Sequence, residues 1–313
     1  MTTKDTPRPS IILDCDPGHD DALAIVIAAR HTDLVGITTV SGNAPIESTT
    51  YNALVMKDML GLDVPVHKGA TRPLVAPPQY AAYVHGESGL DGADLPAPHS
   101  SVDSDDAVGF IIETCRRTEG LWLVPTGPLT NIALALRTAP DIADRIAGIS
   151  LMGGGTFGNR TTAAEFNIWV DPEAADVVFT YGGRLIMAGL HLTHQFRATQ
   201  ARIDRVKALP GPLAAVLGDL MQFFTNTYMT RHFGMDGGAV HDPLAVLALT
   251  HPHLFEHTSS HVVIELTGTH TRGMTLIDAR DLREVKDANC EVLTRVDAES
   301  AFTLLIDAIA SFA

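Results

Sequence analysis

Short apolar runs alternate with longer amphipathic stretches over most of the first two thirds of the chain. Residues 11–13 and 34–40 are rich in β-branched side chains and predict strands, whereas residues 21–30 and 48–60 have the apolar spacing of helices. Such alternation is typical of a mainly parallel sheet with helices on both faces. By the same criteria we expect strands at 64–67, 121–124, 149–152 and 184–188, and helices at 104–118, 128–137 and 172–181.

The remaining segments complete a single α/β domain in this interpretation. Residues 71–103 contain many Pro, Gly and Ser residues and predict a long loop. No linker, composition break or internal repeat is visible, so we expect one domain over residues 1–313, with a mainly parallel open sheet flanked by helices and an antiparallel appendage of C-terminal strands. The C-terminal part predicts helices at 199–209 and 212–231, a helix from Asp242, strands near 261–267, 273–278 and 289–296, and a helix from 298.

Composition narrows the classes of partner. The net charge of −15 opposes binding to nucleic acid or to an anionic membrane surface. The first ten residues lack the layout of a signal peptide, and the longest apolar runs are too short to span a bilayer, so we expect a cytoplasmic protein. Cys15, Cys115 and Cys290 are far apart and lack CxxC spacing, which favours free buried thiols over a disulfide framework or a zinc site.

Polar or glycine-rich segments follow five of the predicted strands. They are DCDPGHDD at 14–21, SGN at 41–43, PTG at 125–127, GGG at 153–155 and HLTH at 191–194. In an open α/β sheet, ligands bind beyond the carboxyl ends of the strands. The sequence therefore predicts a site at that edge.

The first of these segments holds Asp14, Asp16, Asp20 and Asp21 within eight residues. Capping and favourable charge at a helix N-terminus would explain one or two of them, but not all four. Oxygen ligands with no nearby cysteine suit Ca²⁺ or Mg²⁺, although the spacing is not that of an EF-hand. A phosphotransferase could also use a DxD motif here, with the first aspartate as nucleophile. However, the triple glycine continues as TFGNR rather than as a Walker motif, and HGESGL lacks the spacing of a nucleophile elbow.

Six ordered segments resemble the inosine-uridine-preferring nucleoside hydrolase family. The resemblance covers nearly the whole chain and implies the nucleoside hydrolase fold. Members cleave the N-glycosidic bond of ribonucleosides, giving ribose and a free base, and they use a bound Ca²⁺. It also implies a small-molecule ribonucleoside as partner and a homo-oligomer, either dimer or tetramer. The segments are DCDPGHDDA at 14–22, TTVSGN at 38–43, HGESGLDG at 85–92, PTGPLTNIA at 125–133, AEFNIWVDPEAA at 164–175 and HDPLAV at 241–246.

The resemblance assigns metal ligands and a base for the attacking water. It implies that Asp16, Asp21 and Asp242 bind the ion through their side chains and that Thr126 binds it through its backbone carbonyl. Asp16 would also remove a proton from the water, with Asn43 beside it. The Asp242-Pro243 pair additionally predicts a helix N-cap followed by proline at the first helical position.

The resemblance also assigns substrate contacts. Asp20 and Asn167 would bind the ribose 2′- and 3′-hydroxyls. Asn167 lies just ahead of a predicted Asp-Pro helix start at 171–172, which places it on a loop. His241 would assist the leaving base, and His191 and His194 are not expected to form a metal pair despite their spacing. The further expected contacts are Asn159 and Glu165 at the 5′-hydroxyl, Phe166 in the substrate site and His85 near the base.

The base preference and the class of activity remain open at this stage. Residues 222–236 are expected to form part of the base-binding wall, with Met229 and Phe233 at the positions where pyrimidine-preferring relatives tend to carry Gln and Tyr. This departure favours a broad or purine-tolerant hydrolase, with pyrimidine preference as the alternative. A metal-dependent phosphohydrolase and a catalytically silent nucleoside-binding protein are the alternatives from other classes.

Overall fold

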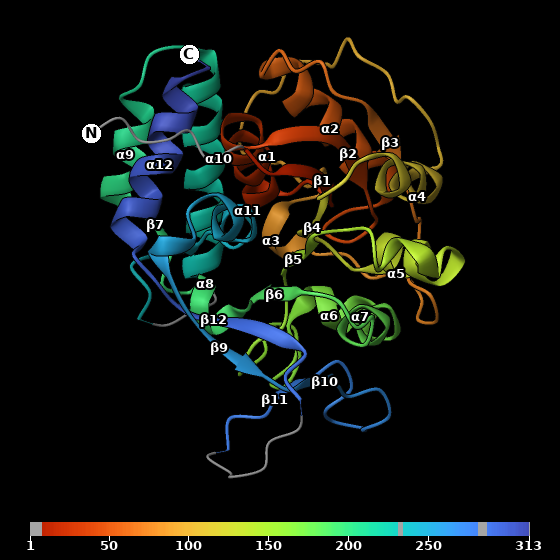
Figure 1. Cartoon of the computed structure of the whole chain (residues 1–313). Coiled ribbons are helices and arrows are strands. Elements are labelled where there is room, and N and C mark those ends of the chain that lie inside the picture. The colour runs from red at the N-terminus through yellow and green to blue at the C-terminus, as the bar shows by residue number, and fades with distance from the viewer. Residues whose placement is uncertain (1–7, 231–233, 281–286, 313) are drawn as a thin grey trace, which may run out of the picture.

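The computed structural model describes residues 8–230, 234–280 and 287–312, and these form an α/β fold around one large sheet (Figure 1). Eight strands pair in the order β3-β2-β1-β4-β5-β6-β12-β9. All neighbours are parallel except the edge strand β9, which runs antiparallel to β12. The strands of this sheet are β1 (Ser10–Cys15), β2 (Asp33–Thr39), β3 (Val66–Lys68), β4 (Trp122–Pro125), β5 (Gly148–Met152), β6 (Leu185–Ala188), β9 (Phe255–Ser260) and β12 (Cys290–Val296).

The two faces of this sheet bury separate apolar cores. Ile11, Leu13 and Cys15 of β1 pack into one core and Ile12 into the other, because successive side chains of a strand point to opposite faces. Helices cover both faces, with α9, α10 and α12 on one side and α4, α5 and α7 on the other (Figure 1). The longer helices are α1 (His19–His31), α2 (Ile46–Met59), α4 (Ala107–Arg117), α5 (Thr130–Thr138), α7 (Pro172–Phe179), α9 (Gln200–Lys207), α10 (Pro212–Met229), α11 (Pro243–Thr250) and α12 (Ala298–Ala310).

Strand register brings the predicted site segments to one edge. Asp14 of β1 pairs with Thr38 of β2 and with Pro125 of β4, so these three strands end at the same level. The loops that follow them carry the SGN and PTG segments and the aspartates after β1. The prediction that these segments share one edge is therefore confirmed for this part of the sheet.

Several short elements were not predicted. The expected loop at 71–103 contains α3 (Ala82–His85). The edge strand β9 was not predicted either, because most of its side chains are exposed and its sequence shows no clear pattern. These segments are too short or too exposed to show a period. The other short elements that were not predicted are α6 (Phe166–Val170), α8 (Leu190–Thr193), β7 (Arg197–Thr199), β8 (Gly237–Ala239) and the 3₁₀ turns at Pro140–Ile142 and Pro252–Leu254. The strands expected near 261–267 and 273–278 are present as β10 (Val262–Ile264) and β11 (Thr275–Ile277).

The prediction of an antiparallel C-terminal appendage was correct only for β10 and β11, which pair with each other in a separate sheet. It was wrong for β12, which inserts between β6 and β9 and extends the parallel sheet. The residues of β12 are mostly buried, as those of an interior strand must be, but a sequence pattern does not specify which strand is the neighbour.

Two predictions from composition can be compared with the structure. The three cysteines are free and buried, as expected. Within the described ranges, no helix combines the length and hydropathy needed to cross a bilayer.

Candidate active site

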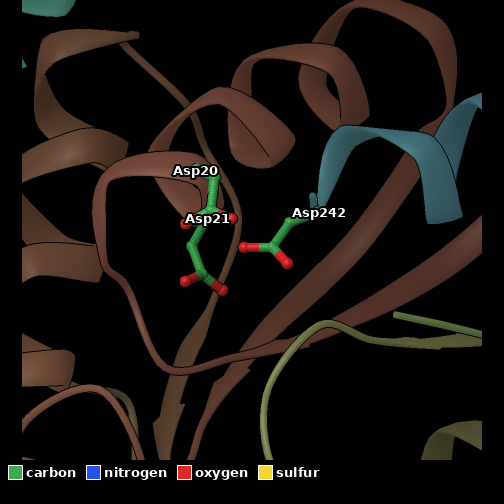
Figure 2. A group of neighbouring side chains, drawn as sticks. All are labelled: Asp20, Asp21 and Asp242. Atoms are coloured by element: carbon green, nitrogen blue, oxygen red, sulfur yellow. The ribbon is translucent and has the colours of Figure 1, made fainter. Parts of the chain in front are cut away.

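Three buried carboxylates converge at the carboxyl end of the sheet. Asp20 and Asp21 lie in the first turn of α1, and Asp242 lies directly before α11. One carboxylate oxygen from each lies within 4.8 Å of those of the other two, and Figure 2 shows Asp242 turned toward the pair on α1. All three residues are at most 5 % exposed. The predicted acidic site therefore exists, although it joins residues more than 200 positions apart.

Helix capping explains only part of this cluster. Asp21 takes part in a capping box, because the Gly18 N–H donates to its Oδ2 at 3.0 Å, and its Oδ1 accepts from the Thr126 hydroxyl at 2.8 Å. Asp242 occupies the N-cap position of α11 before Pro243, but its side chain makes no capping hydrogen bond. The predicted N-cap position followed by proline is therefore confirmed, but the Asp242 side chain faces the other two aspartates instead of capping the helix (Figure 2).

Burial makes the negative charge of this cluster costly. Burial and the nearby Asp21 raise the pKa of Asp20 to about 7. Burial raises the pKa of Asp21, and burial together with Asp20 and Asp21 raises the pKa of Asp242 well above its usual range. Full ionisation of all three therefore requires a compensating positive charge.

Asp16 lies beside the cluster rather than within it. Its Oδ2 accepts a 2.6 Å hydrogen bond from the Asn43 backbone N–H, whereas its Oδ1 is buried without a partner among the described residues. The Asn43 side-chain amide donates to the Asp16 carbonyl and to Asp21 Oδ2, both at 3.1 Å, and so links the two aspartates. Gly42 approaches so closely that a Cβ there would lie 2.1 Å from Asp16 Oδ2.

These observations fit a hard divalent cation. The donor set consists of carboxylate oxygens, with an unpartnered carboxylate oxygen nearby at Asp16, and among the described residues it contains no sulfur or imidazole ligand. Oxygen ligands of this kind are typical of Ca²⁺ and Mg²⁺ sites. The geometry groups Asp20 with Asp21 and Asp242, whereas the sequence analysis assigned Asp20 to ribose and Asp16 to the metal.

Asp14 is not part of the acidic cluster, and its hydrogen bonds connect the strand and the helix beside the site. Its Oδ1 accepts hydrogen bonds from the Thr38 hydroxyl at 2.6 Å and the Asn131 amide at 2.8 Å. Asn131 also donates to the Thr39 carbonyl, so Asp14 ties β1 to β2 and α5. Burial raises the pKa of Asp14 to about 7.

One cavity collects almost all of the predicted site residues. Asp16 and Asp21 are the two that do not line it, although both contact residues that do. Phe224 and Tyr228 also line it and lie in the 222–236 segment expected at the base, whereas four lining residues were not predicted: Ala81, Tyr83, Val84 and Met152. The predicted residues that line it are Asp20, Asn43, His85, Thr126, Asn159, Glu165, Phe166, Asn167, His241 and Asp242.

A short helix organises one side of this cavity. Glu165 caps α6, and its carboxylate accepts three backbone N–H bonds, from Gly154, Asn167 and Ile168. Gly154 has a positive φ of 69°, which suits glycine. The prediction that Asn167 lies on a loop was therefore wrong, because the Glu165 cap places it in the first turn of α6. The Asn167 amide donates to the Thr126 carbonyl at 2.7 Å, close to the acidic cluster.

Asn159 also organises this side. Its Oδ1 accepts the Phe166 N–H at 2.9 Å, so the loop before α6 is tied to the helix. Together, Asn159, Glu165 and Asn167 give the cavity a wall of neutral and acidic oxygens, a composition suited to a polyol.

Aromatic and imidazole rings form a second wall of the cavity. Phe224 and Tyr228 are one helical turn apart on α10, and the Tyr228 hydroxyl lies 2.9 Å from His194 Nε2. Met229, by contrast, is 45 % exposed and does not line the cavity, and Phe233 lies outside the described residues. The expectation that Met229 faces the base was wrong, because α10 turns the preceding residue, Tyr228, inward.

Two histidines of this wall have buried partners that sequence reasoning missed. His241 Nδ1 lies 2.7 Å from the Thr193 hydroxyl. His85 Nδ1 lies 3.0 Å from His19 Nδ1, and the two rings stack at 5.3 Å. Both missed residues belong to segments that followed a predicted strand, so their position after a strand was the available signal.

Comparisons with known proteins agree with this geometry. The family model described as inosine-uridine preferring nucleoside hydrolase matches residues 11–303. The chain is 44 % identical over 304 residues to a pyrimidine-specific ribonucleoside hydrolase RihA of Shewanella baltica, covering 96 % of this chain and 95 % of that one. It is 40 % identical over 308 residues to a protein of the same name from Salmonella typhimurium, covering 97 % and 99 %.

A solved structure is also similar over nearly its full length. The purine-preferring ribonucleoside hydrolase from Gardnerella vaginalis superposes with a TM-score of 0.91 at 34 % identity, covering 97 % of this chain and 98 % of that one.

Proposed function

The chain belongs to the inosine-uridine preferring nucleoside hydrolase family, and we propose that it prefers pyrimidine ribonucleosides and acts with a bound Ca²⁺. Membership makes it an N-glycosidase that hydrolyses ribonucleosides. In this proposal the acidic cluster holds the metal ion. Family membership argues against a phosphohydrolase or a catalytically silent binding protein.

The observation that carries the base preference is the similarity to pyrimidine-specific hydrolases along almost the whole chain, at 40–44 % identity. The similar purine-preferring enzyme is less identical, at 34 %. These relatives support pyrimidine preference better than the broad specificity expected from Met229, whose side chain lies outside the cavity. Tyr228 instead contributes a hydroxyl and a ring to the base side.

The acidic cluster would prepare the attacking water. Asp21, Asp242 and the Thr126 carbonyl would hold the cation, whose positive charge would lower the pKa of a water molecule and orient it. Asp16 Oδ1, which has no hydrogen-bond partner in the described part of the chain, accepts the proton that this water loses as its oxygen bonds to C1′. Asn43 holds the other Asp16 oxygen and so keeps Oδ1 directed to the site.

The ribose would lie between the acidic cluster and α6. Asp20 and Asn167 bind the 2′- and 3′-hydroxyls, while Asn159 and Glu165 lie at the 5′-hydroxyl. A neutral polyol needs such a mixture of donors and acceptors. Glu165 carries an acidic group that repels a 5′-phosphate, so nucleosides rather than nucleotides are the substrates.

The departing base would meet the wall of rings. As the C1′–N bond breaks, its electron pair passes to the base, which needs a proton or a hydrogen bond. His241 and His85 line this side, and His241 is the nearer in sequence to the cluster, directly before Asp242. We assign leaving-group assistance to His241 and a base contact to His85.

Cytoplasmic location and assembly into a dimer or tetramer complete the proposal. The three free, buried cysteines are consistent with a reducing compartment.

A panel of ribonucleosides tests the base preference. We expect kcat/KM for uridine and cytidine to exceed that for inosine and guanosine by at least about tenfold, because a hydrophobic pocket separates ligands of different size by about 1–3 kcal/mol. The measurement is release of reducing sugar at several substrate concentrations. Equal or higher values for the purine nucleosides would return the assignment to a broad or purine-preferring enzyme.

Substitution of His241 tests the leaving-group role. His241→Ala should lower kcat/KM for uridine by about 10²–10⁴-fold, the usual contribution of general-acid assistance. A nitrophenolate leaves without such help, so hydrolysis of 4-nitrophenyl riboside should change by less than about tenfold. Both substrates would be measured with metal content checked in parallel. Equal losses would instead assign His241 to support of the neighbouring Asp242.

A further inference from the structure

Thr193 has a buried hydroxyl to which neither the family resemblance nor the proposed reaction assigns a role. It ends α8, in the HLTH segment that follows β6, and it is fully buried. Its Oγ1 lies 2.7 Å from Nδ1 of His241, which is 48 positions away in the sequence. Thr193 itself does not line the cavity, whereas His241 does. The contact therefore reaches the site only through the imidazole ring.

The direction of this hydrogen bond follows from the buried hydroxyl. Among the described residues, His241 is the partner of the Thr193 side chain. A buried O–H without an acceptor is costly, so the Thr193 hydroxyl donates and His241 Nδ1 accepts. A neutral imidazole that accepts at Nδ1 carries its hydrogen on Nε2.

The backbone of His241 is held separately from its ring. The His241 N–H donates to Asp20 Oδ2 at 3.3 Å, and the preceding Val240 N–H donates to the Phe196 carbonyl at 2.8 Å. These bonds fix the main chain and do not involve the ring. The ring lies 5.8 Å from that of His194 and 6.0 Å from that of Tyr228, which restricts it sterically without choosing between its two nitrogens.

We propose that Thr193 is a positioning residue for His241, whose hydroxyl keeps the imidazole hydrogen on Nε2 and directs that N–H to the leaving base. The inference rests on the leaving-group role proposed above for His241. The adjacent His194 contacts the hydroxyl of Tyr228, so residues 193 and 194 together support two side chains of the base wall.

Two conservative substitutions test the role of the hydroxyl. Thr193→Val keeps the shape and removes the hydrogen bond, whereas Thr193→Ser keeps the hydroxyl and removes a methyl group. We expect Thr193→Val to lower kcat for uridine by about 10–100-fold, as loss of an orienting partner commonly does. Its hydrolysis of 4-nitrophenyl riboside should stay within about twofold of wild type, the scatter of a neutral substitution. Thr193→Ser should recover most of the uridine activity.

A double-mutant cycle that combines Thr193→Val with His241→Ala tests whether the hydroxyl acts through the ring. If Thr193 acts through the ring, adding Thr193→Val to His241→Ala should cause no further loss on uridine. Equal losses on both substrates, or unchanged uridine hydrolysis in Thr193→Val, would overturn the inference. Metal content and melting temperature of each variant identify a general structural defect, and Thr193→Ala replaces the valine variant if that one is unstable.

The same experiment separates the two proposals. Equal losses on both substrates in His241→Ala would end the leaving-group assignment itself, and the inference with it. A selective loss in His241→Ala without one in Thr193→Val would overturn only the role of Thr193.

Discussion

Replacing Asp21 by Asn is expected to lower kcat/KM for uridine by about 10³-fold or more. A bound cation supplies several kcal/mol of charge stabilisation in the transition state, and about 4 kcal/mol corresponds to roughly a thousandfold in rate. The substitution keeps the shape of the side chain but removes a charge from the centre of the cluster, where the carboxylate also accepts from Gly18 and Thr126. The measurement combines steady-state kinetics with elemental analysis of the purified protein.

Thermal unfolding gives a second readout of the same substitution. A ligand at about 100 times its Kd stabilises a protein by about 2.7 kcal/mol, so a chelator should lower the melting temperature of the wild type. Asp21→Asn should abolish that response. Without metal, the variant should be at least as stable as the wild type, because one of the mutually repelling carboxylates is gone.

The matched control is Asp63→Asn, which removes the same charge at an exposed position. It should retain both the activity and the response to chelator. Wild-type activity in Asp21→Asn protein that elemental analysis finds metal-free would contradict the metal site.

The enzyme is expected to discriminate against 2′-deoxyuridine by about 10⁴-fold in kcat/KM, the range found where a site built to bind a hydroxyl meets a substrate that lacks it. Asp20 is buried, and the hydrogen bond that its Oδ2 accepts from the His241 N–H is long at 3.3 Å. Loss of the 2′-hydroxyl would leave this carboxylate poorly paired, which is the source of the penalty.

The comparator is 5′-deoxyuridine, for which we expect a smaller penalty. Glu165 already accepts three backbone N–H bonds, so removal of the 5′-hydroxyl leaves no unpaired carboxylate. Initial rates for the three nucleosides would be measured under kcat/KM conditions. Similar kcat/KM values for uridine and 2′-deoxyuridine would exclude the proposed contacts to the 2′-hydroxyl. A larger penalty for 5′-deoxyuridine than for 2′-deoxyuridine would indicate that the sugar binds in the reverse orientation.

Most of the fold could be predicted because it depends on local periodicity. The sequence of β1 is an apolar run followed by polar residues. This pattern arises because a central strand is buried on both faces and its carboxyl end lies at the edge of the sheet where the site forms. The long helices followed from their spacing in the same way. The pairing of β12 with β6 could not be predicted, because neighbouring strands are chosen by the packing of the whole sheet.

The candidate site was likewise predictable where its residues are close together in the chain and not where they are distant. The aspartates after β1 already indicated a cation in the sequence, because like charges at such density require compensation wherever they lie. The carboxylate of Asp242, however, comes close to those of Asp20 and Asp21 only because α11 packs against α1 in the fold. Whether an aspartate caps a helix or faces a ligand depends on its rotamer, and Asp242 and Asp21 differ in this respect.

Local sequence patterns were enough to predict the order of the long helices and of most strands in the main sheet, the acidic edge of the sheet and, through ordered motifs, the family. These features depend on residues close together in the chain, whose spacing and charge are visible directly. Two features could be found only in the folded chain: Tyr228 rather than Met229 lines the cavity, and the Thr193 hydroxyl contacts His241. The rotation of a helix about its axis and a contact between distant segments are set by how the whole core packs, and no local pattern encodes either.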